Sequence, residues 1–232
     1  MMNTTQPCPV PLDLDRDGAC RVVGLATAIL PALLAEFADY PVGQAGLRLS
    51  DAPGLETLLG AGSCVGGEVE ARAGRPMQPV RAVLFDKRAD RNWALGWHQD
   101  RTIAVRARHD VPGYGPWSVK QGICHVEPPF ALIEAMMTLR IHLDPVDRGN
   151  APLRIACGSH RWGRVPVADV EARVAESDQA ICLADTGDVW FYRTPILHAS
   201  DPSDGRATGR RVLQVDYCGQ GLPAPLEWLG IG

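Results

Sequence analysis

The sequence has no pair of cysteines separated by two residues, although seven cysteines are scattered along its 232 residues. Without such a pair, neither a zinc ribbon nor a thiol redox motif is supported. A chain of this length can bury most of the surface that its unfolded form exposes. Because scattered thiols suit a reducing compartment, we expect a cytoplasmic protein that needs no disulfides.

Long apolar runs and blocks of basic residues are missing as well. The most apolar stretch, Val22 to Leu34, contains Pro31 and is too short to cross a bilayer. The first residues are polar and have no basic segment before an apolar one, so we expect no signal peptide. The net charge is −4, and no cluster of lysine or arginine predicts a nucleic-acid surface. The sequence therefore predicts neither a membrane nor a nucleic-acid partner.

The composition that is present is that of an ordinary globular protein, with 46% hydrophobic and 22% charged residues. A chain of this length fits one domain. We therefore expect a single domain over residues 1–232, with a helical N-terminal layer over residues 1–60 and a β-rich core over residues 80–219.

Four helices are expected. Apolar residues recur at roughly helical spacing between Cys20 and Tyr40. A short helix is expected over Asp51 to Leu59, with Asp51 as its N-cap and Pro53 in its first turn. Two further helical segments are expected over residues 129–136 and 167–175, where they interrupt a pattern of short strands.

That pattern consists of short apolar runs after Gly60, separated by Gly, Pro, Asp and Asn. Many short strands bounded by turn residues indicate a sandwich or barrel. The expected strands are Val80–Phe85, Leu95–His98, Ile103–Arg106, Met137–Leu143, Leu153–Ala156, Gln179–Leu183, Val189–Tyr192 and Val212–Tyr217.

One of these strands alternates between apolar and polar residues. Because residues two apart share a face of a sheet, Thr138, Arg140 and His142 lie on one face and Leu139 and Ile141 on the other. A face with an arginine and a histidine is expensive to bury without a purpose. We therefore expect it to face a functional cavity.

His98 and Asp100 are two residues apart, so their side chains leave an extended backbone on the same side. Taken alone, the pair is better explained as two side chains of a solvated loop than as a metal site. A second histidine, His198, follows a turn and a strand far downstream. Two histidines and one carboxylate on one face of an octahedron are typical of non-haem iron(II) oxygenases. A structural zinc site would have four ligands, usually with cysteine, and no cysteine lies near these motifs.

Arg210 lies twelve residues after His198, at the start of the expected last strand. A guanidinium there can bind a carboxylate through two parallel hydrogen bonds, although a pair of solvated arginines is the simpler alternative. Alternation places Arg210 and Arg211 on opposite faces of the strand. The register against Tyr217 favours Arg210, and Arg211 is its rival.

Together, these motifs resemble those of the phytanoyl-CoA dioxygenase family, a branch of the iron(II)- and 2-oxoglutarate-dependent oxygenases. The resemblance covers roughly residues 80–219, and the motifs occur in the order of the family. They are Trp97–Asp100, Asn150–His160, Gly187–Asp188, His198–Ser200, and Arg210 with Tyr217 seven positions on. The resemblance implies a mainly β fold with flanking helices, the double-stranded β-helix (a cupin-like jelly roll).

The resemblance also implies the site. His98, Asp100 and His198 would bind Fe(II), and 2-oxoglutarate would chelate the metal. Arg210 would hold the far carboxylate of 2-oxoglutarate, with help from the hydroxyl group of Ser200. The implied reaction oxidises a small molecule with O₂, by hydroxylation or another outcome, while 2-oxoglutarate yields succinate and CO₂.

Two further arginines are candidates for cofactor binding. Arg140 stands where members of the family often carry a tryptophan, and Arg81 falls near positions that line the cofactor pocket. The carboxylate of Asp100 argues against halogenation, because related halogenases have a small residue in its place. Arg140, Lys120 and Arg81 suggest an anionic group on the substrate.

Candidates for substrate contact are Tyr114, Trp117 and Lys120, in or after a Gly- and Pro-rich loop that we expect to cover the site, and His142. Two alternative functions remain open. One is a cupin-like metal enzyme that does not use 2-oxoglutarate, for which Arg210 would point away from the metal. The other is a jelly-roll binding module, for which the three ligands need not converge.

Overall fold

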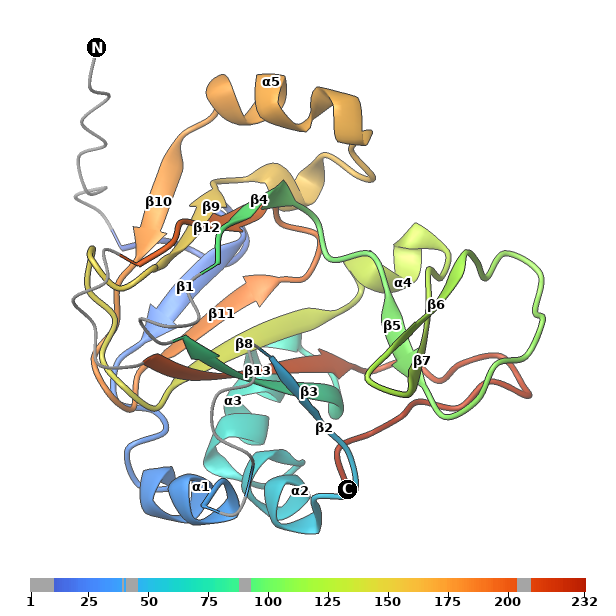
Figure 1. The fold of residues 1–232 in the computed structure, drawn as a ribbon, viewed down its shortest axis with the longest axis horizontal. Helices are drawn as coiled ribbons and strands as arrows, with labels where there is room; N and C mark the ends of the chain where they lie inside the picture. Colours follow the sequence, from blue (N-terminus) through green and yellow to red (C-terminus); the bar gives the residue numbers. More distant parts are fainter. Residues whose placement is uncertain (1–10, 39, 41–45, 88–92, 204–209) are drawn as a thin grey trace.

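Two antiparallel β-sheets face each other at the centre of the computed structural model (Figure 1), which describes residues 11–38, 40, 46–87, 93–203 and 210–232. The larger sheet has the strand order β1-β11-β8-β13-β3-β2 and the smaller one the order β10-β9-β12-β4. The strands of the larger sheet are β1 (Ala19–Val22), β11 (Val189–Arg193), β8 (Met137–His142), β13 (Arg210–Cys218), β3 (Gln78–Lys87) and β2 (Leu47–Leu49). Those of the smaller sheet are β10 (Gln179–Cys182), β9 (Leu153–Ala156), β12 (His198–Ser200) and β4 (Leu95–His98). This is the predicted jelly-roll class.

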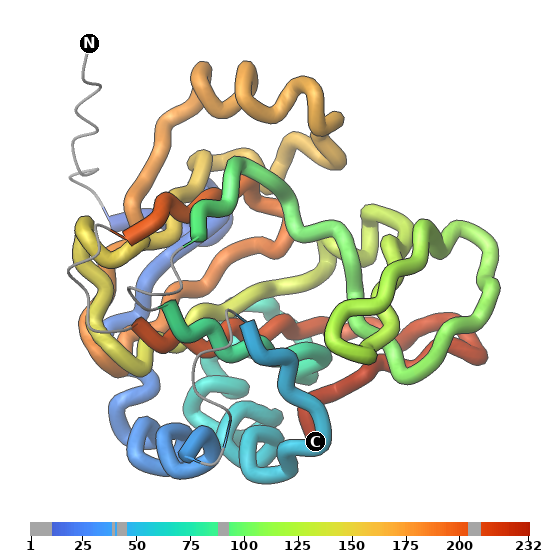
Figure 2. The backbone as a smooth tube through the Cα atoms, viewed as in Figure 1, coloured from blue at the N-terminus to red at the C-terminus, as the bar shows by residue number. Residues whose placement is uncertain are grey.

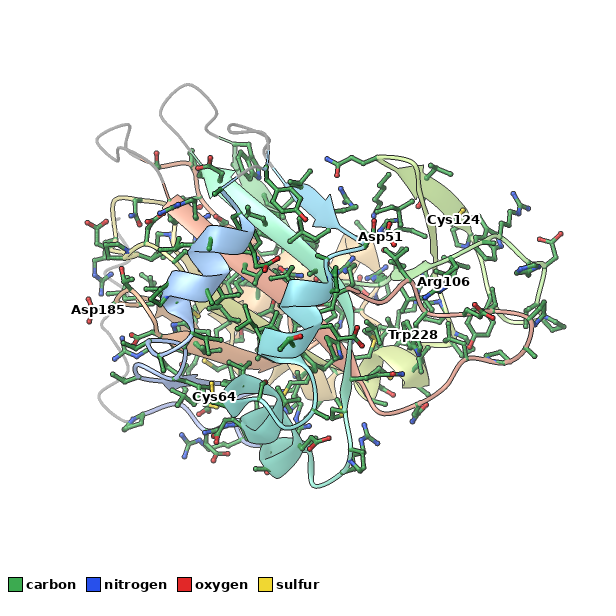
Figure 3. All side chains as sticks on the ribbon, turned by 90° about the horizontal axis from the view of Figure 1, so that it is seen from below. Asp51, Cys64, Arg106, Cys124, Asp185 and Trp228 are labelled. Carbon is green, nitrogen blue, oxygen red and sulfur yellow. The ribbon has the colours of Figure 1, made fainter. Side chains whose placement is uncertain are left out.

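A third sheet, in the order β5-β7-β6, lies at one end of the molecule beside helix α4 (Phe130–Glu134). Its strands are β5 (Ile103–Val105), β6 (Trp117–Lys120) and β7 (Ile123–Val126). After β13 the chain passes this sheet, where Trp228 bridges to Val105, and returns to helix α2 (Figure 2). Figure 3 shows Arg106, Cys124 and Trp228 together at this end, away from Cys64 and Asp185.

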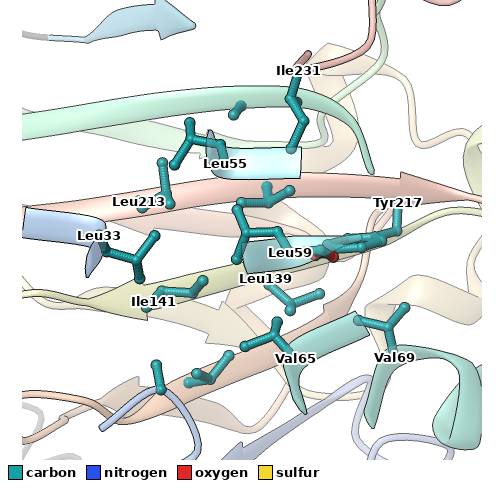
Figure 4. Close-up of a cluster of buried hydrophobic side chains, with 14 of the residues drawn as sticks. Leu33, Leu55, Leu59, Val65, Val69, Leu139, Ile141, Leu213, Tyr217 and Ile231 are labelled. Atoms are coloured by element: carbon teal, nitrogen blue, oxygen red, sulfur yellow. Dashed lines mark hydrogen bonds between the residues drawn. The ribbon is translucent and has the colours of Figure 1, made fainter. Parts of the chain in front are cut away.

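Three helices cover the outer face of the larger sheet: α1 (Leu30–Glu36), α2 (Pro53–Leu59) and α3 (Cys64–Ala73). Their apolar side chains form the main core with the sheet (Figure 4). The fully buried members from helices and strands include Leu33, Leu55, Leu59, Val65, Val69, Leu139, Ile141, Leu213 and Tyr217. Each large aliphatic side chain in this layer contributes about 1.5–3 kcal/mol through burial. The core therefore fixes the large sheet as a platform.

The strands of the platform send alternate side chains to the two faces. On β13, Leu213 and Val215 belong to the helix-covered core, whereas Arg210, Gln214 and Asp216 are buried on the face toward the small sheet. On β8, the predicted alternation is present, because Leu139 and Ile141 face the helices. The space between the two sheets is consequently lined by polar and charged side chains.

The eight predicted strands are all present, with ends within two residues of those expected. The helix expected over Cys20 to Tyr40 is wrong for its first half. Residues 19–22 form β1, which pairs with β11, and the helix begins only at Leu30. Pro31 explains the start, since it has no amide hydrogen and is tolerated in a first turn. The helices predicted over 129–136 and 167–175 are present as α4 and as the 3₁₀ turn η2 (Val167–Asp169) with α5 (Val170–Ala175).

The predicted N-cap at Asp51 is also wrong. The residue before α2 is Ala52, and Asp51 has a left-handed backbone with φ of 57°. Pro53 does occupy the first turn. Besides β1, the elements that the sequence did not predict are α3, β2, β6, β7, β12 and the 3₁₀ turn η1 (Ser159–Arg161). Within the described residues, none of the helices combines the length and apolar character that crossing a membrane requires.

Candidate metal centre

His98, Asp100 and His198 meet between the two sheets. Strands β4 and β12 pair in antiparallel fashion, and their register sets His98 directly opposite His198. The two imidazole centroids are 4.3 Å apart. One ligand atom from each histidine and one from Asp100 all lie within 4.8 Å of one another. Residues a hundred positions apart in the chain therefore form one cluster of metal-ligating type.

Both histidines are oriented by their own backbone. Nδ1 of His98 lies 2.8 Å from the carbonyl oxygen of Gly96, and Nδ1 of His198 lies 3.0 Å from that of Ile196. Because a carbonyl oxygen only accepts hydrogen bonds, each Nδ1 carries the proton and each Nε2 keeps its lone pair. Burial, with the nearby His98, lowers the pKa of His198 to about 4. The buried imidazole is therefore neutral at neutral pH, which is the form that binds a metal.

Asp100 supplies the oxygen ligand. Burial acts to raise the pKa of Asp100, but the charges of His198 and Arg81 outweigh it and lower the pKa to about 2. Arg81 on β3 donates from Nε to Asp216 at 2.6 Å, and its Nη2 lies 3.7 Å from Asp100. Nε2 of Gln214 approaches the same carboxylate at 3.4 Å. Two imidazole nitrogens and an ionised carboxylate fit a divalent first-row metal such as iron.

Gln99 holds the segment between the two ligands. Its side chain is buried and points away from the cavity, since neighbours along an extended chain alternate. Nε2 donates to the carbonyl oxygens of Gly163 and Pro195 at 2.9 and 2.8 Å, and Oε1 accepts from the amide of Val165 at 3.0 Å. Gln99 thereby fixes the backbone from which the flanking ligands project.

Replacing Gln99 with leucine should leave these three backbone groups buried and unpaired. We expect unfolding free energy to fall by about 2–4 kcal/mol and metal affinity to fall by about 10–100-fold. Urea unfolding and nickel titration measure the two effects. The control is Gln220→Leu, at an exposed position. Unchanged nickel affinity in Gln99→Leu would contradict its positioning role.

A pocket of buried cations lies near the metal centre. Lys87 at the end of β3 is directly opposite Arg210 at the start of β13, and both side chains are buried. Nζ of Lys87 is 3.0 Å from Oγ of Ser200 on β12, two residues after His198. Ser200 Oγ and Arg210 Nη1 both donate to the carbonyl oxygen of Ala151. Three strands therefore bring two cations and a hydroxyl group together.

The charge of this pocket is not balanced by the residues that the structure describes. No described carboxylate lies within ion-pair distance of Lys87 or Arg210, and Arg210 Nε has no described partner. Burial, then Arg210 and Arg140, lowers the pKa of Lys87 to about 7. Burial, then Arg140, lowers the pKa of Arg210 to about 9. Buried charges normally need partners, so this pocket has the chemistry of an anion site.

Arg140 and His142 continue the same face of β8. Arg140 donates to Gln214 at 3.3 Å, and through Gln214 it connects to Asp100. Its Nε has no partner among the described residues. His142 is buried, and burial, then Arg140 and Arg210, lowers the pKa of its ring to about 3. His142 therefore lies beside the cationic pocket as a neutral ring.

Arg211 and Arg81 each pair with a carboxylate of the protein. The guanidinium of Arg211 donates twice to Asp144, at 2.9 and 2.8 Å, on the opposite face of β13 from Arg210. Arg81 is held by Asp216 and approaches Asp100. Arg211 thus has a carboxylate partner outside the cavity, and Arg81 is positioned to orient a metal ligand rather than to bind a free carboxylate.

Two of the substrate candidates, Trp117 and Lys120, lie on opposite faces of β6. Tyr114 and Trp117 pack in an apolar cluster with Val105 and Val126, which favours a packing role over the predicted substrate contact. Lys120 lies on the other face of β6, because it alternates with Val119 and shares a face with Ser118. The position of Trp117 therefore does not support the prediction that residues 111–117 cover the site.

Sequence reasoning missed Lys87 and Arg48. Lys87 lies at the end of a strand beside a charged segment, and only its pairing with Arg210 reveals its place. The alternation of β3, in which Arg81 and Lys87 share a face, is the signal that could have found it. Arg48 lies on β2, a strand of three residues that is too short to show a pattern.

Comparisons with known proteins agree with this fold. The phytanoyl-CoA dioxygenase (PhyH) family model matches residues 14–212. The chain is similar to AviO1 from Streptomyces viridochromogenes Tue57 (TM-score 0.60, 22% identity, covering 91% of this chain and 95% of that one). It is also similar to the non-haem α-ketoglutarate-dependent epimerase SnoN from nogalamycin biosynthesis (TM-score 0.63, 15% identity, 88% and 80%). A third similar structure is HygX from Streptomyces hygroscopicus with nickel and 2-oxoglutarate bound (TM-score 0.59, 13% identity, 88% and 84%).

No curated protein sequence matches the chain significantly. The similar structures share its fold at low identity. The family model, in contrast, matches well over half of the sequence, and its span includes His98, Asp100 and His198. The chain therefore belongs to the phytanoyl-CoA dioxygenase family.

Proposed function

We propose that the protein is an Fe(II)- and 2-oxoglutarate-dependent oxygenase that hydroxylates, or otherwise oxidises, a small molecule with O₂. One observation carries the proposal. The His-Asp-His cluster and a pocket of buried cations without a carboxylate partner both border the space between the two sheets. Family membership and the His-Asp-His cluster both support iron and 2-oxoglutarate as the cofactors.

His98, Asp100 and His198 would hold the iron. Two of their donor atoms come from the paired strands β4 and β12 and the third from Asp100, two residues after β4, so the remaining coordination positions are left for ligands from the opposite side. When bound, iron and 2-oxoglutarate supply the oxidising chemistry, in which O₂ is consumed and 2-oxoglutarate becomes succinate and CO₂. The protein contributes the orientation of the ligands through Gln99 and Arg81.

Arg210, Ser200 and Lys87 would hold the far carboxylate of 2-oxoglutarate. Arg210 offers a planar guanidinium whose Nε has no described partner. Ser200 and Lys87, which donate to backbone carbonyl oxygens and to one another without the cofactor, lie beside it on neighbouring strands and would turn to the bound carboxylate. Arg140, between this pocket and Asp100, is placed to contact the same molecule. A dianion would balance the positive charge that burial otherwise makes costly.

The alternatives fit less well. A cupin-like enzyme without 2-oxoglutarate has no need of a carboxylate-binding arginine, yet Arg210 is buried on the cavity face. A binding module has no need for His98, Asp100 and His198 to meet, yet their ligand atoms lie within 4.8 Å of one another. Both observations support the oxygenase.

The test is a turnover assay with Fe(II), ascorbate and 2-oxoglutarate against a panel of metabolites. We expect succinate to form only when both Fe(II) and 2-oxoglutarate are present, and at a higher rate with the true substrate. A chelator should abolish the signal. Absence of succinate, together with no binding of 2-oxoglutarate to the metal-loaded protein, would refute the proposal.

The role of Lys87 predicts how 2-oxoglutarate affinity depends on pH. The pKa of Lys87 is about 7, so its ammonium form is present below pH 7 and is lost above it. Burial lowers this pKa most, Arg210 on β13 and Arg140 on β8 lower it further, and Asp201 after β12 raises it. We expect the Kd for 2-oxoglutarate to rise by up to about tenfold per pH unit above pH 7.

Calorimetry on the nickel-loaded protein between pH 6.5 and 8.5 measures this change in Kd. Over that range Arg210 stays mostly charged, because its pKa is higher, at about 9. In Lys87→Met the Kd should be higher at pH 6.5 and independent of pH. Arg148→Met removes an exposed cation and should behave as wild type. A wild-type Kd that is constant or falls with pH would contradict the assigned role.

A further inference from the structure

We propose that Arg48 and Lys120 form a second anion site, which binds a carboxylate or phosphate group of the substrate. This inference rests on the proposed function and names the substrate class. The site lies between the β6–β7 hairpin and β2, where Arg48 is opposite Val83 on the cavity face of β3. It is built from residues different from those of the cationic pocket around Arg210.

The β6–β7 hairpin presents two different faces. Trp117 and Val126 are cross-strand partners in an apolar cluster with β5 and α4. Ser118 and His125 are partners on the opposite face, and Lys120 shares that face because it is two residues from Ser118. The lysine and the buried His125 therefore line one surface.

Gln121 fastens this surface to β2. The tip of the hairpin is Gln121–Gly122, both with positive φ, as a tight two-residue turn requires. Gln121 Oε1 accepts from the amide of Arg48 at 3.1 Å, and its Nε2 donates to the carbonyl oxygen of Gly46 at 2.8 Å. Lys120 is the neighbour of Gln121, so the clamp brings two cationic residues together.

The polar atoms of this surface are incompletely paired. Arg48 Nε and His125 Nε2 are buried and have no partner among the described residues. Within the same residues, no carboxylate forms an ion pair with Arg48 or Lys120. Burial, then Arg81 and Arg48, lowers the pKa of Lys120, and burial, then Arg81, lowers that of Arg48. The two cations therefore repel each other, and no described carboxylate neutralises them.

The position of the pair suits a substrate. Arg48 pairs with Val83, which shares a face of β3 with Arg81, and Nη2 of Arg81 lies 3.7 Å from Asp100, so the surface lies beside the metal centre. Arg81, the cation nearest to Asp100, is already held by Asp216 and is not free to bind a substrate. An anionic group on Arg48 and Lys120 would leave the rest of the molecule directed toward the metal ligands.

The test uses protein loaded with nickel and saturating 2-oxoglutarate, which fills the first anion site. Benzoate, phenyl phosphate and inorganic phosphate are the anionic probes, and benzamide is the neutral counterpart. We expect at least one anion to bind about tenfold or more tightly than benzamide by calorimetry. Arg48→Gln and Lys120→Met should each weaken that binding by about tenfold.

Several comparisons separate the outcomes. Arg108→Gln removes a cation whose side chain is 62% exposed, in the segment between β5 and β6, and should leave anion binding unchanged. Gln121→Ala keeps both cations but releases the clamp, so it should weaken anion binding and leave 2-oxoglutarate binding intact. Equal binding of anions and benzamide, or unchanged binding in both charge variants, would overturn the site.

Affinity for 2-oxoglutarate distinguishes this inference from the proposed function. It should be unchanged in Arg48→Gln and Lys120→Met, and a parallel loss would assign both residues to the cofactor pocket and overturn the substrate site. Wild-type protein that binds neither nickel nor 2-oxoglutarate would instead refute the oxygenase proposal, and this inference with it.

Discussion

Replacing His198 with alanine is expected to abolish turnover of 2-oxoglutarate and to lower metal affinity by more than about 100-fold. Loss of a residue that only orients a metal ligand costs up to about 100-fold, and loss of the ligand itself should cost more. Among the residues that the structure describes, His198 is one of three candidate ligands, and its Nε2 is free to bind because Nδ1 is hydrogen-bonded to the carbonyl oxygen of Ile196. The two remaining ligands cannot fix one face of an octahedron. Nickel calorimetry and the succinate assay measure the two losses.

The matched control is His109→Ala, which removes an exposed histidine outside the cluster. It should retain metal affinity and activity. Because His198 is buried between the sheets, the circular dichroism of the variant should be recorded to show that it folds. A folded His198→Ala protein that binds nickel as tightly as wild type would exclude the assigned metal centre.

Replacing Arg210 with methionine is expected to raise the Kd for 2-oxoglutarate by about 30-fold or more. Truncating one partner of a buried, hydrogen-bonded charge pair costs about 2–5 kcal/mol, and about 1.4 kcal/mol corresponds to a tenfold change. The cost arises because the carboxylate of 2-oxoglutarate would remain buried without its bidentate partner. Calorimetry on the nickel-loaded variant measures the change.

The same substitution should not destabilise the ligand-free protein. The guanidinium of Arg210 is buried beside Lys87 and Arg140, and burial with Arg140 already lowers its pKa to about 9. An apolar side chain of similar length removes that repulsion. We therefore expect the melting temperature without ligands to stay the same or rise, while the stabilisation by 2-oxoglutarate is lost.

Arg211→Met is the control, since its guanidinium pairs with Asp144 outside the cavity. This pair is partly exposed, so its loss should cost at most about 1 kcal/mol of stability. Affinity for 2-oxoglutarate should be unchanged. If Arg211→Met lost the cofactor and Arg210→Met kept it, the roles of the two arginines would be exchanged.

The pairing of His98 with Asp100 and the separation of Arg210 from Arg211 could be predicted because both follow from local geometry, whereas His198 was added through the order of the family's motifs. His98 ends β4 and Asp100 follows it two residues later, so both side chains leave the same side, and the alternation of β13 separates Arg210 from Arg211. Strands with a buried and a polar face are readable for the same reason, as β8 shows. These features need only the period of the chain.

Other features depend on contacts between distant segments. Lys87 becomes part of the pocket only through its pairing with Arg210, and Arg48 only through the side chain of Gln121. Residues 19–22 have apolar spacing that suits a helix, but pairing with β11 makes them a strand. Helix α3 escaped notice because two glycines weaken its pattern, although Ser63 caps it.

The hold of Gln121 on Arg48 and Gly46 also matters for the edge of the large sheet. Strand β2 is its last strand, so one side of its backbone would otherwise offer an unpaired amide and carbonyl to another chain. Exposed edges of this kind invite strand addition and aggregation. A side-chain amide satisfies both groups without continuing the ladder, and it thereby occupies the place where another strand would pair with Arg48 and Gly46.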